Sequence, residues 1–167
     1  MMKPSEIRTR LETTFGSAAV LAATDFRGET TVTIAPGQLL EVGRFLRDAP
    51  EISLDFLSFV AGVDRYPERP RFEVVYQLYS TKYRHRFRVK AYIDETAEAP
   101  PIIDSVVGIW PTANWHERET AEMFGIVFRG HPDLRKLLLP EEWTVHPLRK
   151  DFPLEGTEET ADLPRRA

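Results

Sequence analysis

The chain has 167 residues, of which 42% are hydrophobic and 29% charged, and this balance predicts one globular domain with a buried core. A formal net charge of −4 argues against a general nucleic-acid binder, and the absence of cysteine excludes disulfides, thiol nucleophiles and cysteine-ligated zinc or iron–sulfur sites. The first residues lack the apolar core of a secretory signal, and no apolar run approaches the ~20 residues of a bilayer-spanning helix, so membrane association would have to come through another protein.

The first half of the chain predicts helices that alternate with strands. Residues 5–15 are typical of a helix, because Ser5 can cap its start, apolar residues recur on one face, and Gly16 can end it. Two strands joined by a tight turn are predicted next, at residues 19–25 and 30–34. A helix that begins with a proline is predicted at residues 36–47, and the apolar stretch at 52–63 fits either a strand or a helix.

The second half predicts the rest of a sheet and one further long helix. Four elements are expected in chain order: strands at 72–79 and 84–92, a short helix at 102–109 and a brief strand at 126–128. Between the last two, Asn114 is expected to cap a helix, with Glu117 at the reciprocal capping position. Gly125 is expected to end that helix.

These elements predict an α+β domain over residues 1–130, in which helices pack on a small mixed or antiparallel sheet. Prolines recur after residue 130 and forbid long regular elements there. Residues 131–167 are therefore predicted to form an extended C-terminal arm with a polar tail, which docks on a partner. We expect the tail, residues 155–167, to be mobile unless a partner holds it.

One predicted strand carries a basic face, with aromatic and apolar side chains on the opposite face. A row of cations can bind phosphates, and with aromatic residues it resembles a nucleic-acid platform. Here the aromatic residues face away from the cations, where they would enter the core, so a solvated or charge-protected strand is favoured. The basic residues are Lys82, Arg84, Arg86, Arg88 and Lys90.

The predicted helix at residues 114–125 is densely charged. His116 and Glu119 lie three residues apart, a spacing at which imidazole and carboxylate can hold a metal, but no second Glu-x-x-His helix or His-Glu-x-x-His motif completes such a site. Arg118 and Glu122 form an i,i+4 pair, so a lattice of ion pairs is favoured. We expect Glu117, Arg118, Glu119 and Glu122 to lock the helix to its own sheet and arm.

Two similar short segments follow this helix, and we call them the first and second His-Pro phrases. Each joins a His-Pro bend to an apolar residue and an Arg-Lys pair: residues 131–136 (His-Pro-Asp-Leu-Arg-Lys) and residues 146–150 (His-Pro-Leu-Arg-Lys). Extended, proline-fixed segments of this kind typically lie along a partner and offer it charged and apolar side chains. The chain has no Gly-x-Ser-x-Gly elbow, glycine-rich phosphate loop or dinucleotide fingerprint, so we expect no catalytic, cofactor-binding or metal-ligating residue in it.

Over the same residues the chain resembles a known family, the C subunit of the type I NADH:quinone oxidoreductase, respiratory complex I. The resemblance rests mainly on residues 117–136 and 146–154, with similar stretches at 64–67, 71–76 and 110–115. Three positions depart from the family pattern: Glu122 replaces aspartate, Ala121 replaces a larger residue, and Val145 replaces the glycine that usually precedes the second His-Pro.

The resemblance implies a non-catalytic subunit in the peripheral arm of a proton-translocating complex, at the cytoplasmic side of a bacterial membrane. It implies no cofactor in this chain, with FMN and iron–sulfur clusters in partner subunits. The D subunit of complex I would be the main contact, with the B subunit and other peripheral-arm subunits nearby. Related energy-converting nickel–iron hydrogenases and other complex-I-like dehydrogenases use the same module and remain an alternative.

The residues that carry the family signature lie on the charged helix and in the arm. We expect the histidines and charged residues of the arm to build the partner interface, and Arg149→Ala to weaken assembly before it unfolds the domain. The full set is Glu117, Arg118, Glu119, Glu122, Gly125, Gly130, His131, Pro132, Arg135, His146, Pro147, Arg149, Lys150 and Asp151.

Overall fold

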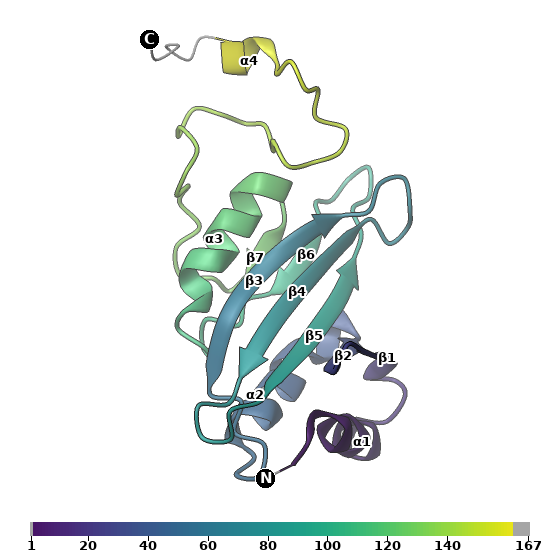
Figure 1. The fold of residues 1–167 in the computed structure, drawn as a ribbon. Coiled ribbons are helices and arrows are strands. Elements are labelled where there is room, and N and C mark those ends of the chain that lie inside the picture. The colour runs from purple at the N-terminus through teal and green to yellow at the C-terminus, as the bar shows by residue number, and fades with distance from the viewer. Residues whose placement is uncertain (1, 162–167) are drawn as a thin grey trace.

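The computed structural model describes residues 2–161, which form a five-stranded mixed sheet with helices packed against it (Figure 1). The elements in chain order are α1 (Pro4–Phe15), β1 (Val20–Phe26), β2 (Glu29–Ile34), a 3₁₀ turn (Pro36–Gln38), α2 (Leu39–Asp48), β3 (Phe56–Asp64), β4 (Phe72–Tyr79), β5 (Arg86–Ile93), β6 (Ile102–Asp104), α3 (Ala113–Phe124), β7 (Val127–Arg129) and α4 (Glu158–Ala161). The predicted α+β class is confirmed.

The strand order in the main sheet is β1-β2-β5-β4-β3. The pair β2–β5 is parallel, and the other three neighbouring pairs are antiparallel. A second, two-stranded sheet pairs β6 with β7 in parallel. The mixed sheet places β3 and β1 at its two edges, and α3 lies beside β3 (Figure 1).

The core lies between the sheet and the helices, and strand alternation supplies it. One face of β4 carries Phe72, Val74, Tyr76 and Leu78, all nearly fully buried. Two glycines let the helices approach closely. A Cβ at Gly43 of α2 would lie 2.9 Å from the Ile109 side chain, and a Cβ at Gly62 of β3 would lie 2.6 Å from the ring of Phe124 in α3.

Several local predictions are wrong at helix boundaries. The first helix begins at Pro4, a favoured first residue, and its N-cap is Lys3 in place of Ser5; Gly16 ends it with φ +70°, as predicted. The helix predicted to be capped by Asn114 begins at Ala113, after Thr112. Its Glu117 does not reach back to the helix start, because the side chain is fully buried and bonds to Ser105 and Val106.

Residues 102–109 are not a helix. Ile102–Asp104 form β6, because pairing with β7 holds them extended, and a turn follows in which Ile109 N–H and Trp110 N–H both donate to the Val106 carbonyl, at 2.8 and 2.9 Å. For residues 52–63, where either a strand or a helix was expected, the structure has a strand, β3, at Phe56–Asp64.

The C-terminal arm passes along α3 and then crosses above it before it reaches α4 (Figure 1). Between β7 and α4 the described arm contains no helix or strand, as its prolines predict. α4 falls within the tail that we expected to be mobile, and residues 162–167 lie outside the described residues, so the mobility of the tail stays a prediction. Within residues 2–161 no helix is long and apolar enough to cross a membrane.

Candidate functional site

The second His-Pro phrase caps the C-terminus of α3. The last carbonyls of a helix have no partner within it, and their partial negative charge favours a cation. Here three successive carbonyls accept hydrogen bonds from the arm: Glu122 O from His146 Nδ1 at 2.8 Å, Met123 O from Leu148 N at 3.1 Å, and Phe124 O from Arg149 Nε at 2.7 Å. The phrase is therefore a helix cap supplied by a distant segment of the same chain.

Gly125 makes this cap possible in two ways. Its φ of +72° lies in the left-handed region, which ends α3 without strain only for glycine. A Cβ there would also lie 2.6 Å from the His146 ring and 2.8 Å from an Arg149 nitrogen. Gly130 shares the left-handed backbone at φ +81°, but a Cβ there would meet nothing within 4 Å.

Glu122 holds the middle of the arm. Its buried carboxylate accepts backbone N–H groups from three consecutive residues, Leu137, Leu138 and Leu139, at 2.9–3.2 Å. Such charge-assisted bonds satisfy the carboxylate without a cation. The longer glutamate is thus accommodated at the position where aspartate is usual.

Arg118 binds the arm through carbonyl groups. Its guanidinium donates to Arg135 O at 2.8 Å and Lys136 O at 3.1 Å. The predicted Arg118–Glu122 ion pair is wrong, because both side chains turn to the arm backbone. Glu119 is exposed, and within residues 2–161 it forms no ion pair or hydrogen bond. Helix and arm are therefore joined chiefly by side chain–backbone bonds and not by an ion-pair lattice.

The first His-Pro phrase begins with a fixed imidazole. His131 Nε2 lies 3.1 Å from Asn114 O and must be the donor, because a carbonyl only accepts, while Nδ1 accepts Asp133 N–H at 3.0 Å. Arg135, four residues on, is exposed and pairs only locally with Asp133, at 2.8 Å. Pro132 is also exposed.

Glu117 is fully buried between α3 and the loop after β6. It accepts Ser105 Oγ–H at 2.6 Å and Val106 N–H at 2.8 Å. Burial raises the pKa of Glu117 to about 7, although these two hydrogen bonds act in the opposite direction. His131 Nε2 lies 4.0 Å from its carboxylate. Glu117 thus fixes α3 to its own sheet, as expected for this residue.

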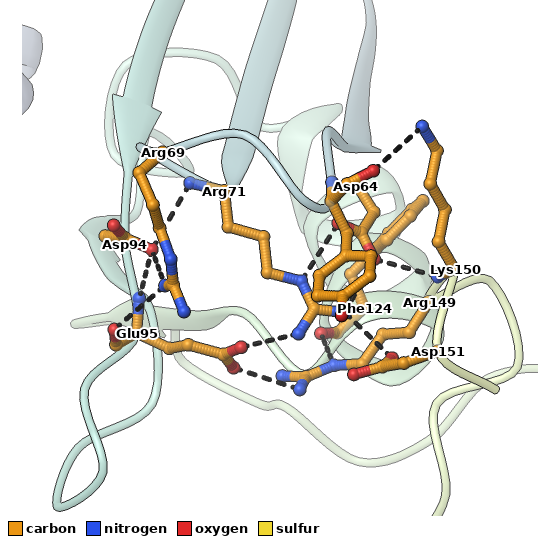
Figure 2. Close-up of polar contacts among 10 residues, drawn as sticks. Asp64, Arg69, Arg71, Asp94, Glu95, Phe124, Arg149, Lys150 and Asp151 are labelled. Atoms are coloured by element: carbon orange, nitrogen blue, oxygen red, sulfur yellow. Dashed lines mark hydrogen bonds and ion pairs between the residues drawn. The ribbon is translucent and has the colours of Figure 1, made fainter.

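A buried ion cluster joins the end of the arm to the sheet (Figure 2). Arg71, at the start of β4, donates two hydrogen bonds to Asp64 at 2.9 and 2.7 Å, one to Glu95 at 2.6 Å and one to Asp151 of the arm at 2.8 Å. Arg149 of the arm in turn donates to Glu95 at 3.0 Å. Arg71 of the body therefore pairs with an aspartate of the arm, and Arg149 of the arm pairs with a glutamate of the body.

The electrostatics of this cluster centre on Asp64. Burial alone would raise its pKa, but hydrogen bonds from Arg71 and from the N–H groups of Lys150 and Tyr66 outweigh burial and hold the pKa well below its ordinary value. The hydrogen bonds that Arg71 donates to Asp64 and to Asp151 raise the pKa of its guanidinium. Asp64, Asp151 and Arg71 are therefore charged at neutral pH.

The ring of Phe72 adds a further contact. The guanidinium carbons of Arg71 and Arg149 lie 5.0 and 5.1 Å from its centroid, within cation–π range. Sequence reasoning assigned no role to Arg71, Asp64 or Glu95. The family resemblance includes the stretches that begin at Asp64 and Arg71, but local sequence did not show that Glu95 and Asp151, 24 and 80 residues from Arg71, would join them.

The predicted basic strand face is shorter than expected, because β5 begins at Arg86, and Lys82 and Arg84 lie in the turn before it. Arg88 forms an ion pair with Glu29 at 2.6 Å and a hydrogen bond with Gln77 at 2.9 Å, and Lys90 pairs with the buried Glu73 at 2.6 Å. A continuous row of five cations is therefore not present on this strand. Within residues 2–161 no group of three or more His, Asp or Glu side chains could hold a metal ion.

The predicted site residues therefore gather on one feature, the seam between α3 and the arm. His146, Arg149, Lys150 and Asp151 all contact their own domain, and whether they also face a partner stays a prediction. Val145 has no left-handed backbone, so this position does not need the usual glycine. The arrangement can hold the arm against α3 and the sheet and leave the outer side of the arm open to another protein.

Comparison with known proteins places the chain in a family. Residues 32–158 match the family of the respiratory-chain NADH dehydrogenase 30 kDa subunit. The C subunit of NADH-quinone oxidoreductase from Roseiflexus sp. (strain RS-1) is 50% identical over 143 residues, which is 86% of this chain and 80% of that protein. A C subunit of the same oxidoreductase from Rhizobium meliloti (strain 1021) is 51% identical over 123 residues, 74% of this chain and 65% of that protein.

Two solved structures share the fold. A trypsin-resistant fragment (1-134) of Nqo5 matches with a TM-score of 0.64 and 30% identity, over 80% of this chain and all of that one. The membrane-bound sulfane sulfur reductase, an archaeal respiratory membrane complex, contains a chain that matches with a TM-score of 0.73 and 23% identity, over 92% of this chain and 87% of that one. The chain belongs to the family of the 30 kDa subunit of respiratory-chain NADH dehydrogenase.

Proposed function

We propose that this chain is a non-catalytic assembly subunit in the peripheral arm of a proton-translocating NADH:quinone oxidoreductase, respiratory complex I. The observation that carries the proposal is the family match, which runs through the sheet, α3 and the arm. Two relatives at 50% identity are C subunits of NADH-quinone oxidoreductase. Several family-signature residues, among them Glu117, Arg118, Glu122 and Arg149, hold chain segments together, which suits a subunit that positions others.

The proposed partners follow from the family. The D subunit of complex I is the main contact in this proposal, with the B subunit and other peripheral-arm subunits beside it. The chain would reach the cytoplasmic side of a bacterial membrane only through the complex, and FMN and the iron–sulfur clusters would belong to those partners.

The relative Nqo5 was solved as a trypsin-resistant fragment, which supports a compact body that is distinct from the arm.

The fold alone also occurs in a respiratory membrane complex of another kind, the sulfane sulfur reductase. An equivalent subunit of an energy-converting nickel–iron hydrogenase or another complex-I-like dehydrogenase is therefore the alternative. The two functions differ in what co-purifies: NADH-oxidising flavin and iron–sulfur subunits for complex I, and a nickel–iron subunit for the hydrogenases.

Arg149→Ala tests the assembly role of the arm. The substitution removes the cap on Phe124 O and the ion pair to Glu95 but leaves Arg71, Asp64 and the core in place. We expect the yield of assembled complex to fall by about tenfold, because loss of about 1–2 kcal/mol in positioning the arm corresponds to that factor. The isolated chain should stay folded. Normal assembly together with a destabilised chain would contradict the role.

A pair of glycine variants provides the matched control. Gly125→Ala and Gly130→Ala both place alanine in a left-handed backbone, at a shared cost of about 1–2 kcal/mol. Only Gly125→Ala also drives a Cβ into the His146 ring and Arg149. Gly125→Ala should therefore reproduce the assembly loss of Arg149→Ala, while Gly130→Ala should assemble nearly normally.

A further inference from the structure

β3 is an edge strand that lacks most of the usual protection. It spans nine residues at one edge of the main sheet. Edge strands leave backbone N–H and C=O groups free to pair with another chain, and proteins usually shield them with lysine, proline or a covering segment. Phe56–Asp64 contains no lysine, arginine or proline, and Phe59 is 38% exposed. A register shift between Leu57 and Phe59, and a hydrogen bond from Thr112 Oγ1 to Leu57 O at 3.1 Å, affect only the start of the strand, and the pairing with β4 is regular from Phe59 to Asp64.

The other edge of the sheet differs. β1 carries Asp25, which pairs with Arg8 of α1 at 3.4 Å and accepts a hydrogen bond from Thr30 at 2.6 Å. This edge therefore carries an exposed charged residue within the strand, whereas the only charged residue of β3, Asp64, is buried at its end. Phe26 at the end of β1 is exposed like Phe59 and provides a matched reference.

A groove runs beside the free edge of β3. It has a volume of about 150 Å³, with Val60, Ala61 and Gly62 on one wall and Thr120 and Met123 of α3 on the other. In Figure 1, α3 lies alongside β3. A groove between an edge strand and a helix suits an extended peptide, which pairs its backbone with the strand and places alternate side chains against the helix.

The rim of the groove indicates the chemistry of its occupant. Exposed Leu148 of the arm offers apolar surface there, whereas the exposed side chain of Phe59 lies on the opposite face of the sheet, beside Gln77 and Arg88. Glu119 also lines the groove, and within the described residues its carboxylate pairs with no cation. A basic side chain on the occupant would complement it. β3 has no basic residue, so a second copy that paired strand to strand could not supply one from its own β3.

We propose that an extended segment of a neighbouring subunit pairs with β3 as a further strand. Its side chains on the groove side include an apolar residue against Leu148 and a basic residue opposite Glu119, and its alternate side chains lie beside Phe59 on the other face of the sheet. The inference rests on the proposed function, which supplies the neighbouring subunit. It assigns a role to Glu119, the one signature carboxylate of α3 that forms no hydrogen bond or ion pair with sheet or arm in residues 2–161.

Amide hydrogen exchange tests the proposal. The exchange of residues 59–63 is compared between the full-length chain alone and the same chain in the complex purified from native membranes. Strand pairing should slow these amides by about tenfold or more on assembly, while residues 20–26 of β1 should change little. Phe59→Lys should lower complex yield by about tenfold, and Phe26→Lys, the same change at the other edge, should not.

The outcomes separate the two proposals. Unchanged exchange at residues 59–63 within an intact complex, or equal yields for the two variants, would overturn strand pairing and leave the proposed function standing. A dimer of the isolated chain that Phe59→Lys dissolves would make a second copy the occupant, and the proposal would be wrong. Failure of the wild-type chain to purify with any complex would contradict the proposed function, and with it the neighbour that strand pairing requires.

Discussion

Arg71→Met is expected to lower the free energy of unfolding by about 3–5 kcal/mol, the range for removing one partner of a buried ion pair. The Arg71 side chain is 4% exposed and its partner Asp64 is 1% exposed. Methionine fills a similar volume but leaves the carboxylate of Asp64 buried without a cation. Because Arg71 also binds Asp151, the end of the arm should detach, and trypsin should cut more readily at Arg149 and Lys150.

Arg69→Met is the matched control for this prediction. Arg69 lies two residues away and pairs with Asp94, but its side chain is 58% exposed. An exposed pair contributes about 0–1 kcal/mol, so this variant should remain close to wild type. Urea unfolding of both variants measures the difference. Similar losses in the two variants would contradict the assignment of Arg71 as the centre of the ion cluster.

Glu117→Gln is expected to remove a pH dependence of stability. Burial raises the folded-state pKa of Glu117 from its ordinary 4.5 to about 7, so the folded chain binds a proton that the unfolded chain has released. The contribution of Glu117 is therefore fully present below about pH 4.5 and is lost as the pH rises toward 7. Near pH 8 the ionised carboxylate should cost about 3 kcal/mol relative to a neutral side chain.

Glutamine suits this test because it stays neutral and can keep both contacts, accepting Val106 N–H and donating to Ser105 Oγ. The variant should match wild type near pH 4.5 and exceed its unfolding free energy by about 3 kcal/mol near pH 8. Urea unfolding at several pH values measures the two curves. A constant difference between them across this range would show that Glu117 does not titrate in the folded chain.

Much of the fold follows from local pattern. The strands predicted at residues 72–79 and, from alternation, at 84–92 are β4 and β5, although β5 begins two residues later, at Arg86; Gly125 correctly marked the end of α3. The helix predicted at residues 102–109 was wrong because the strand there has only three residues and pairs in parallel with a segment more than twenty residues away. The periodicity of a sequence does not reveal such pairing. At Asn114, the capping motif was overridden by burial of Glu117.

The site was only partly predictable, for a similar reason. The charge and proline content of α3 and the arm identified the residues of the seam, but not what they bind. Glu122 and Arg118 are spaced as an ion pair, yet each finds a backbone partner in the arm. Arg71 belongs to an ordinary strand start and becomes central only when Glu95 and Asp151 are folded beside it. Such roles depend on tertiary contacts.

The most direct test of the assembly role is to purify the tagged chain from its native membranes in mild detergent and identify its companions by mass spectrometry. We predict a large complex that includes a quinone-site subunit, iron–sulfur subunits and a flavin-bearing NADH subunit. A nickel–iron subunit in place of the NADH subunit would assign the chain to the hydrogenase relatives. Recovery of the chain alone, from the soluble fraction, would contradict the role as an assembly subunit.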